Sequence, residues 1–111
     1  MSALEYDACH VMAPGETLHA QHKEYPLFHA LIYGDPTRCA KLSKRLACAL
    51  RSLPLRLEFR YEHDTLAALE AGIGADPTLV LDGAIFLEGL PSAEEITERF
   101  GQLLIARNSR N

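Results

Sequence analysis

Hydrophobic and polar residues follow regular patterns only after the first 25 residues of the chain. Residues 1–25 show neither a helical nor a strand period, and they contain the chain breaker Pro14-Gly15. Apolar periodicity then continues from Pro26 to Ile105. We therefore predict an N-terminal arm over residues 1–26 and a folded domain over residues 27–111.

The first half of the domain has the pattern strand, helix, strand. Residues 27–33 are short and apolar, as in a buried central strand. In residues 36–53 leucines recur every three or four positions on one face, Asp35 is placed to cap the helix, and Pro36 takes its first position. Residues 55–62 alternate apolar and charged side chains, which predicts a strand with one wet face at an edge of the sheet.

The second half adds a short helix, a hairpin and a long helix. Residues 65–71 form the short helix, because Gly72 follows as a stop signal. An Asp-Gly pair separates two apolar runs, residues 78–81 and 84–87, and is a strong hairpin signal because both turn residues need positive φ. The last helix opens at Ser92, which stands in capping-box spacing to a glutamate.

This order of elements predicts an α/β fold. Four strands form one mixed sheet in the sequence β-α-β-α-β-β-α, with helices flanking it. The first crossover joins two parallel strands through a helix and must therefore be right-handed.

Composition and charge narrow the function classes. The 111 residues, 48% apolar and 23% charged, suffice for one globular domain. With 11 Lys and Arg against 15 Asp and Glu, the net charge of -4 provides no cationic field for nucleic acid. The apolar runs are shorter than the roughly 20 residues that span a bilayer. The start of the chain lacks the basic residues and apolar stretch of a secretory signal, so we expect a cytoplasmic protein without membrane or nucleic-acid partners.

The three cysteines, Cys9, Cys39 and Cys48, form an odd set without Cys-x-x-Cys spacing. This argues against a disulfide framework and against a four-cysteine zinc site. On the predicted helix Cys48 lies nearly opposite Cys39, on a face with four cations, and we expect it to be an accessible free thiol. The arm adds Cys9-His10 and His19-x-x-His22, but this spacing matches no compact ligand motif, so we predict no metal and no cofactor.

The chain resembles the thioredoxin-like superfamily, especially its small glutaredoxin-like members, over residues 27–104. The most specific match is residues 74–83, in which a small-residue loop, a proline, an apolar strand and an Asp-Gly hairpin follow one another. The resemblance implies that Pro77 is a cis-proline whose loop lies beside the first helix. Thr, Val or Ile often precedes that proline in the family. Asp76 stands there in this chain, and its carboxylate would repel a thiolate.

In the family the first helix begins with Cys-x-x-Cys, whose leading cysteine is stabilised as a thiolate by the helix end. If the helix begins at Pro36, Cys39 corresponds to the second cysteine and Pro36 replaces the nucleophile. An alternative register makes Cys39 the leading cysteine, as in single-cysteine glutaredoxin-like proteins. The sequence leaves both registers open.

The reactivity of Cys39 is likewise open at this point. Its place on the apolar stripe of the helix predicts a buried thiol with a pKa above the usual value of about 8.5. Its place near the helix start, beside Arg38 and ahead of Lys41, favours a thiolate.

Our first hypothesis is a redox protein that acts on thiols or disulfides through Cys39, with an external thiol resolving the mixed disulfide. Its partner would be a protein or a low-molecular-weight thiol or disulfide. The candidate substrate-binding residues are Pro36, Thr37, Arg38, Asp76 and Pro77. The alternative is a non-catalytic protein-interaction module of the same fold with a degenerate active site.

Overall fold

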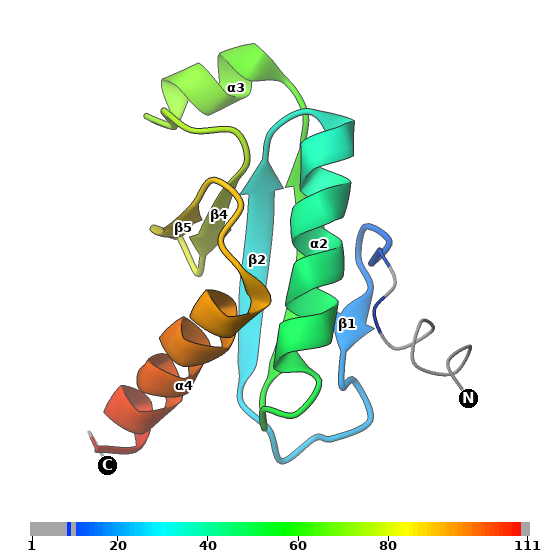
Figure 1. The fold of residues 1–111 in the computed structure, drawn as a ribbon, viewed down its shortest axis with the longest axis vertical. Helices are drawn as coiled ribbons and strands as arrows, with labels where there is room; N and C mark the ends of the chain where they lie inside the picture. Colours follow the sequence, from blue (N-terminus) through cyan, green and yellow to red (C-terminus); the bar gives the residue numbers. More distant parts are fainter. Residues whose placement is uncertain (1–8, 10, 110–111) are drawn as a thin grey trace.

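The computed structural model describes Cys9 and residues 11–109 (Figure 1). The elements, in chain order, are β1 (Thr17–Leu18), β2 (Leu27–Tyr33), α2 (Pro36–Leu50), β3 (Arg56–Glu62), α3 (Thr65–Glu70), β4 (Thr78–Leu81), β5 (Ala84–Glu88) and α4 (Ala93–Ser109). The strands form one mixed sheet in the order β1-β3-β2-β4-β5. The predicted α/β architecture with a mixed sheet is confirmed.

The sheet has five strands, whereas we predicted four. The parallel pair β2 and β3 and the antiparallel strands β4 and β5 are the predicted ones. The additional strand, β1, pairs antiparallel with β3, Thr17 opposite Glu58 and Leu18 opposite Leu57. The prediction that β3 lies at the edge of the sheet is therefore wrong where β1 pairs with it. A strand of two residues is too short to show a period, so the pattern could not reveal it.

Helices α2 and α4 pack against each other (Figure 1). The apolar stripe of α2 and the inward side chains of β2 and β3 form the core, in which Leu42, Leu46 and Phe59 are fully buried. Helix α2 ends at Leu50, three residues earlier than predicted. Pro54 explains part of this difference, because a proline disfavours helical conformation at the residue before it.

The local signals in the second half of the domain are confirmed. Asp82 and Gly83 have φ of 49° and 90° in the turn between β4 and β5. Ahead of α4, the Ser92 amide donates to Glu95 Oε1 at 2.9 Å and the Glu95 amide donates to Ser92 Oγ at 3.1 Å. These reciprocal bonds form a capping box.

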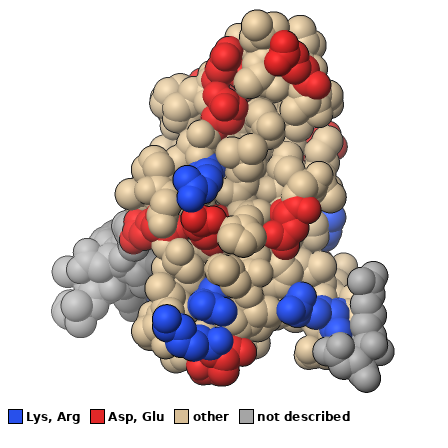
Figure 2. Space-filling model, turned by 180° about the vertical axis from the view of Figure 1, so that it is seen from behind, with Lys and Arg blue, Asp and Glu red and all other residues tan. Residues whose placement is uncertain are grey.

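Helix α3 lies past the ends of β2 and β3, at one end of the molecule (Figure 1). Asp and Glu side chains gather at this end in Figure 2, whereas the Lys and Arg side chains in that view lie mostly in the opposite half. None of the helices in the described part of the chain is long and apolar enough to cross a membrane.

Candidate functional site

The candidate site lies where β2 ends and α2 begins. Gly34 makes the turn, with a φ of 148° and an amide that donates to the Glu62 carbonyl at 3.1 Å. A Cβ on Gly34 would overlap the Asp76 carboxylate and lie 3.1 Å from Pro77 Cα. The glycine therefore lets the loop before β4 pack directly on the start of α2. Pro77 in that loop is buried, and the Asp76–Pro77 peptide bond is cis.

Two aspartates and an arginine connect the loop to the helix. Asp76 Oδ1 accepts from the Asp35 amide at 3.1 Å, and Asp35 Oδ1 caps α2 by accepting from the Arg38 amide at 2.9 Å. The Arg38 guanidinium lies 3.6 Å from a carboxylate oxygen of each aspartate. All three side chains are partly exposed, so these ion pairs position the loop more than they stabilise the fold.

Cys39 is buried one turn inside α2, with 1% of its surface exposed. Its thiol lies 3.7 Å from the Ile32 carbonyl, to which it donates. Burial, and after it the charges of Asp76 and Asp35, raise the pKa of Cys39 to about 11. Arg38, which we considered as a group that favours a thiolate, pairs with those same aspartates. At neutral pH the thiol is protonated and is a weak nucleophile.

An N-terminal segment covers the region beside Cys39. We call residues 11–14 the strap. Met12 of the strap is 2% exposed, its amide donates to Ser43 Oγ at 2.8 Å, and its carbonyl accepts from the Tyr61 hydroxyl. Burial raises the pKa of Tyr61, so this hydroxyl keeps its proton at neutral pH. The strap borders a cavity of about 310 Å³, which we call the strap cavity and which Cys39 also lines.

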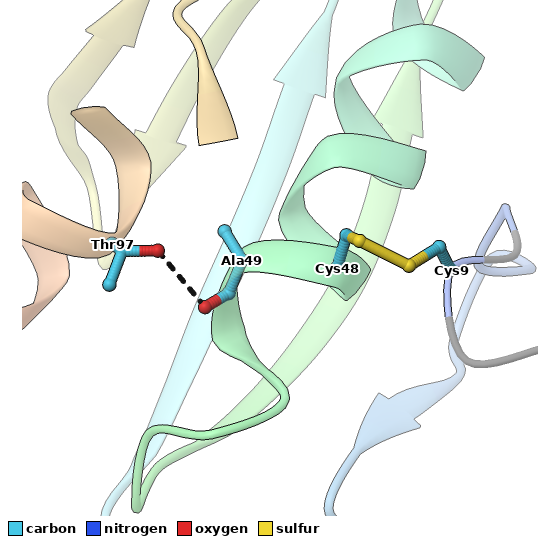
Figure 3. Close-up of a disulfide and its surroundings, with 4 residues drawn as sticks. All are labelled: Cys9, Cys48, Ala49 and Thr97. Carbon is cyan, nitrogen blue, oxygen red and sulfur yellow. Dashed lines mark hydrogen bonds between the residues drawn. A yellow bond between two sulfur atoms is a disulfide. The ribbon is translucent and has the colours of Figure 1, made fainter. Parts of the chain in front are cut away.

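Cys9 and Cys48 form a disulfide (Figure 3). The predictions that the cysteines act singly and that Cys48 is a free surface thiol are therefore wrong. The two cysteines are 39 positions apart, and pairing of β1 with β3 brings the N-terminal segment back across the domain. Sequence reasoning missed the bond because nothing in the arm predicted this return. Cys39 is the free cysteine of the described chain.

The candidate metal ligands of the N-terminal arm either have other roles or lie outside the described residues. Cys9 is in the disulfide, and His10 lies outside the described residues. His19 Nε2 lies 3.2 Å from the Leu50 carbonyl, and the ring of His22 stacks on Tyr25. Within the described chain, no three His, Cys, Asp or Glu side chains gather as a metal-binding group.

A second cavity, of about 320 Å³, lies between α3, the start of α2 and the loop before β4. We call it the end cavity. Ala68, Leu69 and Ile73 are among its apolar lining residues. Its charged lining residues are Asp35, Asp64 and Asp76. His63 also lines it, and His63 Nδ1 lies 2.9 Å from the Gly34 carbonyl oxygen.

The structure brings most of the predicted site residues together. Pro36, Thr37 and Arg38 form the exposed first turn of α2, and Asp76 stands beside them. Pro36 lines both cavities, Asp76 lines the end cavity and Cys39 lines the strap cavity. The α3 side of the end cavity was missed. Leu69 is 72% exposed and Leu66 of the same helix is 58% exposed, but two leucines on a short helix give no site signal in a sequence.

Three features of this fold define a thioredoxin-like protein. They are a β-α-β crossover, a hairpin that follows it, and a proline-containing loop that packs against the start of the first long helix. A family model that describes a thioredoxin domain matches residues 32–100, more than half of the chain. The chain therefore belongs to the thioredoxin-domain family. No curated protein matches it in a sequence comparison.

Proposed function

We propose that this chain is a non-catalytic thioredoxin-fold module that binds a segment of a partner protein in the end cavity. The observation that carries this proposal is the burial of Cys39, which is 1% exposed and protonated at neutral pH. Helix α2 begins at Pro36, the position that the leading cysteine of the family motif would take in this register. A proline has no group that can attack a disulfide.

The chemistry of the end cavity indicates the kind of segment that it holds. A volume of about 320 Å³ is at the lower end of the range for ligand pockets and suits one side chain. The apolar wall of Ala68, Leu69 and Ile73 favours an aliphatic or aromatic group. Arg38 partly neutralises two of the three lining aspartates, which leaves the rim acidic. The segment therefore carries an apolar side chain next to a basic one.

An NMR titration with two small probes tests this proposal. Phenethylamine and phenylacetate share an aromatic ring and differ in the sign of their charge. We expect phenethylamine to shift the amide signals of Gly34, Ala68 and Gly74 in a saturable way, and phenylacetate to shift them much less. Equal shifts with both probes, or no saturable shift, would contradict the proposal.

Two variants of α3 supply the control for that titration. Ala68→Trp fills the end cavity and should abolish the response to phenethylamine. Glu70→Gln also changes α3, but Glu70 does not line the end cavity, and this variant should respond like the parent protein. If phenethylamine still shifts these amide signals in Ala68→Trp, the probe binds outside the end cavity and the proposal is contradicted.

Single-cysteine redox activity is the second candidate function, because Cys39 and Pro36 both line the strap cavity. In that reaction the Cys39 thiolate would attack a disulfide or glutathione adduct and release one thiol, and an external thiol would then reduce the mixed disulfide. The first turn of α2 and the Asp76–Pro77 loop would hold the substrate. Glutathione-dependent reduction of bis(2-hydroxyethyl) disulfide separates the candidates. The binding module predicts the uncatalysed rate for parent and Cys39→Ala alike, and the redox protein predicts turnover that Cys39→Ala loses.

A further inference from the structure

We propose that the Cys9–Cys48 disulfide is a thiol-exchange site for a dithiol reductant, and that its reduction releases the strap and opens access to Cys39. The inference rests on the disulfide and on the contacts of the strap. It does not depend on what the end cavity binds.

The disulfide is accessible without unpacking of the helices. Cys48 is an exposed residue of α2, and Cys9 is half-buried. Figure 3 shows the bond on one side of α2, while the Ala49 carbonyl on the other side accepts from Thr97 Oγ1 at 3.2 Å. A thiol that approaches Cys48 therefore leaves the contact between α2 and α4 intact.

The exchange follows from the accessibility of the two sulfurs. One thiolate of the dithiol attacks Sγ of Cys48, the S–S bond breaks, and Cys9 leaves as a thiolate that takes up a proton. The second thiolate of the reductant then attacks the mixed disulfide and releases Cys48 as a thiolate, which is protonated in turn. The protein gains two electrons and two protons, and the dithiol is oxidised to its own disulfide.

The strap and the strand after it are held in different ways. From Gly15 onward the chain is bonded to the sheet, because the Gly15 amide donates to the Phe59 carbonyl at 2.7 Å and the Phe59 amide donates to the Glu16 carbonyl at 3.0 Å. Residues 11–14 are held by the disulfide ahead of them, by the buried side chain of Met12 and by its bonds to Ser43 and Tyr61. At the other end of the strap, the Ala13 amide donates to Glu16 Oε1 at 2.7 Å and the Glu16 amide donates to the Ala13 carbonyl at 2.9 Å, so the strap remains attached to the sheet there. Reduction breaks the one covalent bond that holds the strap and leaves the hydrogen bonds between β1 and the sheet in place.

Release of the strap changes the surroundings of Cys39. Residues 11–14 form one wall of the strap cavity, and Pro36, Cys39 and Tyr61 are among the residues that form the rest. When that wall swings away, solvent and small reagents reach the Cys39 thiol through local opening, without unfolding of the core. The Cys9–Cys48 disulfide thus controls how accessible the Cys39 thiol is, although Cys39 is not one of the two bonded cysteines.

Dithiothreitol and iodoacetamide test the two halves of this proposal. In the native oxidised protein, dithiothreitol should reduce the Cys9–Cys48 bond at a rate proportional to its concentration, followed by mass spectrometry. A rate that is independent of dithiothreitol and tracks global unfolding would overturn the exchange site. After removal of the reductant, site-resolved alkylation of Cys39 by iodoacetamide should be about tenfold faster or more than in the oxidised protein. Equal rates in the two forms would overturn the opening.

Controls separate release of the strap from general unfolding. The Cys9→Ser/Cys48→Ser variant should match the reduced parent. Amide hydrogen exchange of Phe59, in the core, should stay slow in both, and loss of its protection would overturn the local mechanism. In the reduced protein Tyr61→Phe should increase the Cys39 rate further, because it removes the bond to the Met12 carbonyl. Tyr25→Phe makes the same chemical change away from the strap cavity and should have no effect.

These outcomes are independent of the proposed function. A failed probe titration at the end cavity refutes the binding module and leaves the exchange site standing. Equal Cys39 alkylation rates in the oxidised and reduced forms refute the opening and leave the binding module standing.

Discussion

The buried thiol of Cys39 makes the stability of the fold depend on alkaline pH. The pKa of a cysteine in an unfolded chain is about 8.5, and burial with two nearby aspartates raises that of Cys39 to about 11 in the folded protein. Below pH 8.5 both states hold the proton, and the contribution of Cys39 to the free energy of unfolding is constant. Between the two pKa values the unfolded chain loses the proton and the folded chain keeps it. Stability therefore falls as the pH rises through this window.

The size of the effect follows from the difference between the two pKa values. Each pKa unit corresponds to about 1.4 kcal/mol, so a difference of roughly 2.5 units removes about 3 kcal/mol of unfolding free energy by pH 11. Cys39 is 1% exposed, so solvent screening does not reduce this figure substantially. Cys39→Ala has no titrating group at this position and should lack this part of the pH dependence.

Guanidinium unfolding at pH 8 and pH 10.5 measures the effect. Groups that the two proteins share contribute to both losses, so the loss in Cys39→Ala is subtracted from the loss in the parent. Mass spectrometry after each unfolding curve verifies that the Cys9–Cys48 pairing has survived. We expect the parent to lose about 2 kcal/mol more than the variant over this interval. Parallel losses would refute the argument that Cys39 is buried as a neutral thiol.

Further predictions concern the cross-link, the turn and the last helix. Removal of the disulfide in Cys9→Ala/Cys48→Ala should lower the free energy of unfolding by about 4 kcal/mol, because a bridge over 39 positions restricts the unfolded chain; a loss under about 1 kcal/mol in chemical denaturation would contradict this. Gly34→Ala should cost about 2 kcal/mol in the same assay and abolish the response to phenethylamine, since the new Cβ displaces the Asp76 carboxylate; unchanged stability would show that the loop adapts freely. Ser92→Ala should cost about 1 kcal/mol through loss of the α4 cap, with no change in probe binding.

The parts of the fold with strong local signals were predictable from the sequence. The Asp-Gly turn at Asp82 and the capping box at Ser92 each depend on the chemistry of a few adjacent residues, and both occur as expected. The start of α2 at Pro36 was also encoded locally, since an aspartate cap and a proline at the first position suit a helix start. Such elements need no knowledge of the rest of the chain.

The parts that depend on contacts between distant residues were not predictable. Strand β1 exists because two residues of the N-terminal segment pair with β3, about 40 positions later in the chain. The same return brings Cys9 to Cys48. The sequence could place Cys39 on an apolar stripe, but it could not decide between burial and a stabilised thiolate. That outcome depends first on how the rest of the core packs over this face of α2 and buries the thiol, and then on the charges of Asp76 and Asp35 at the helix start.

The thiol of Cys39 is buried in this thioredoxin-domain protein while the Cys9–Cys48 disulfide is intact. The most direct test is the rate of Cys39 alkylation in the native oxidised protein between pH 6 and pH 10, measured residue by residue by mass spectrometry. We expect Cys39 to react slowly throughout this range while the disulfide is intact. Fast alkylation with an apparent pKa below about 8.5 would contradict it and would identify Cys39 as a reactive thiol.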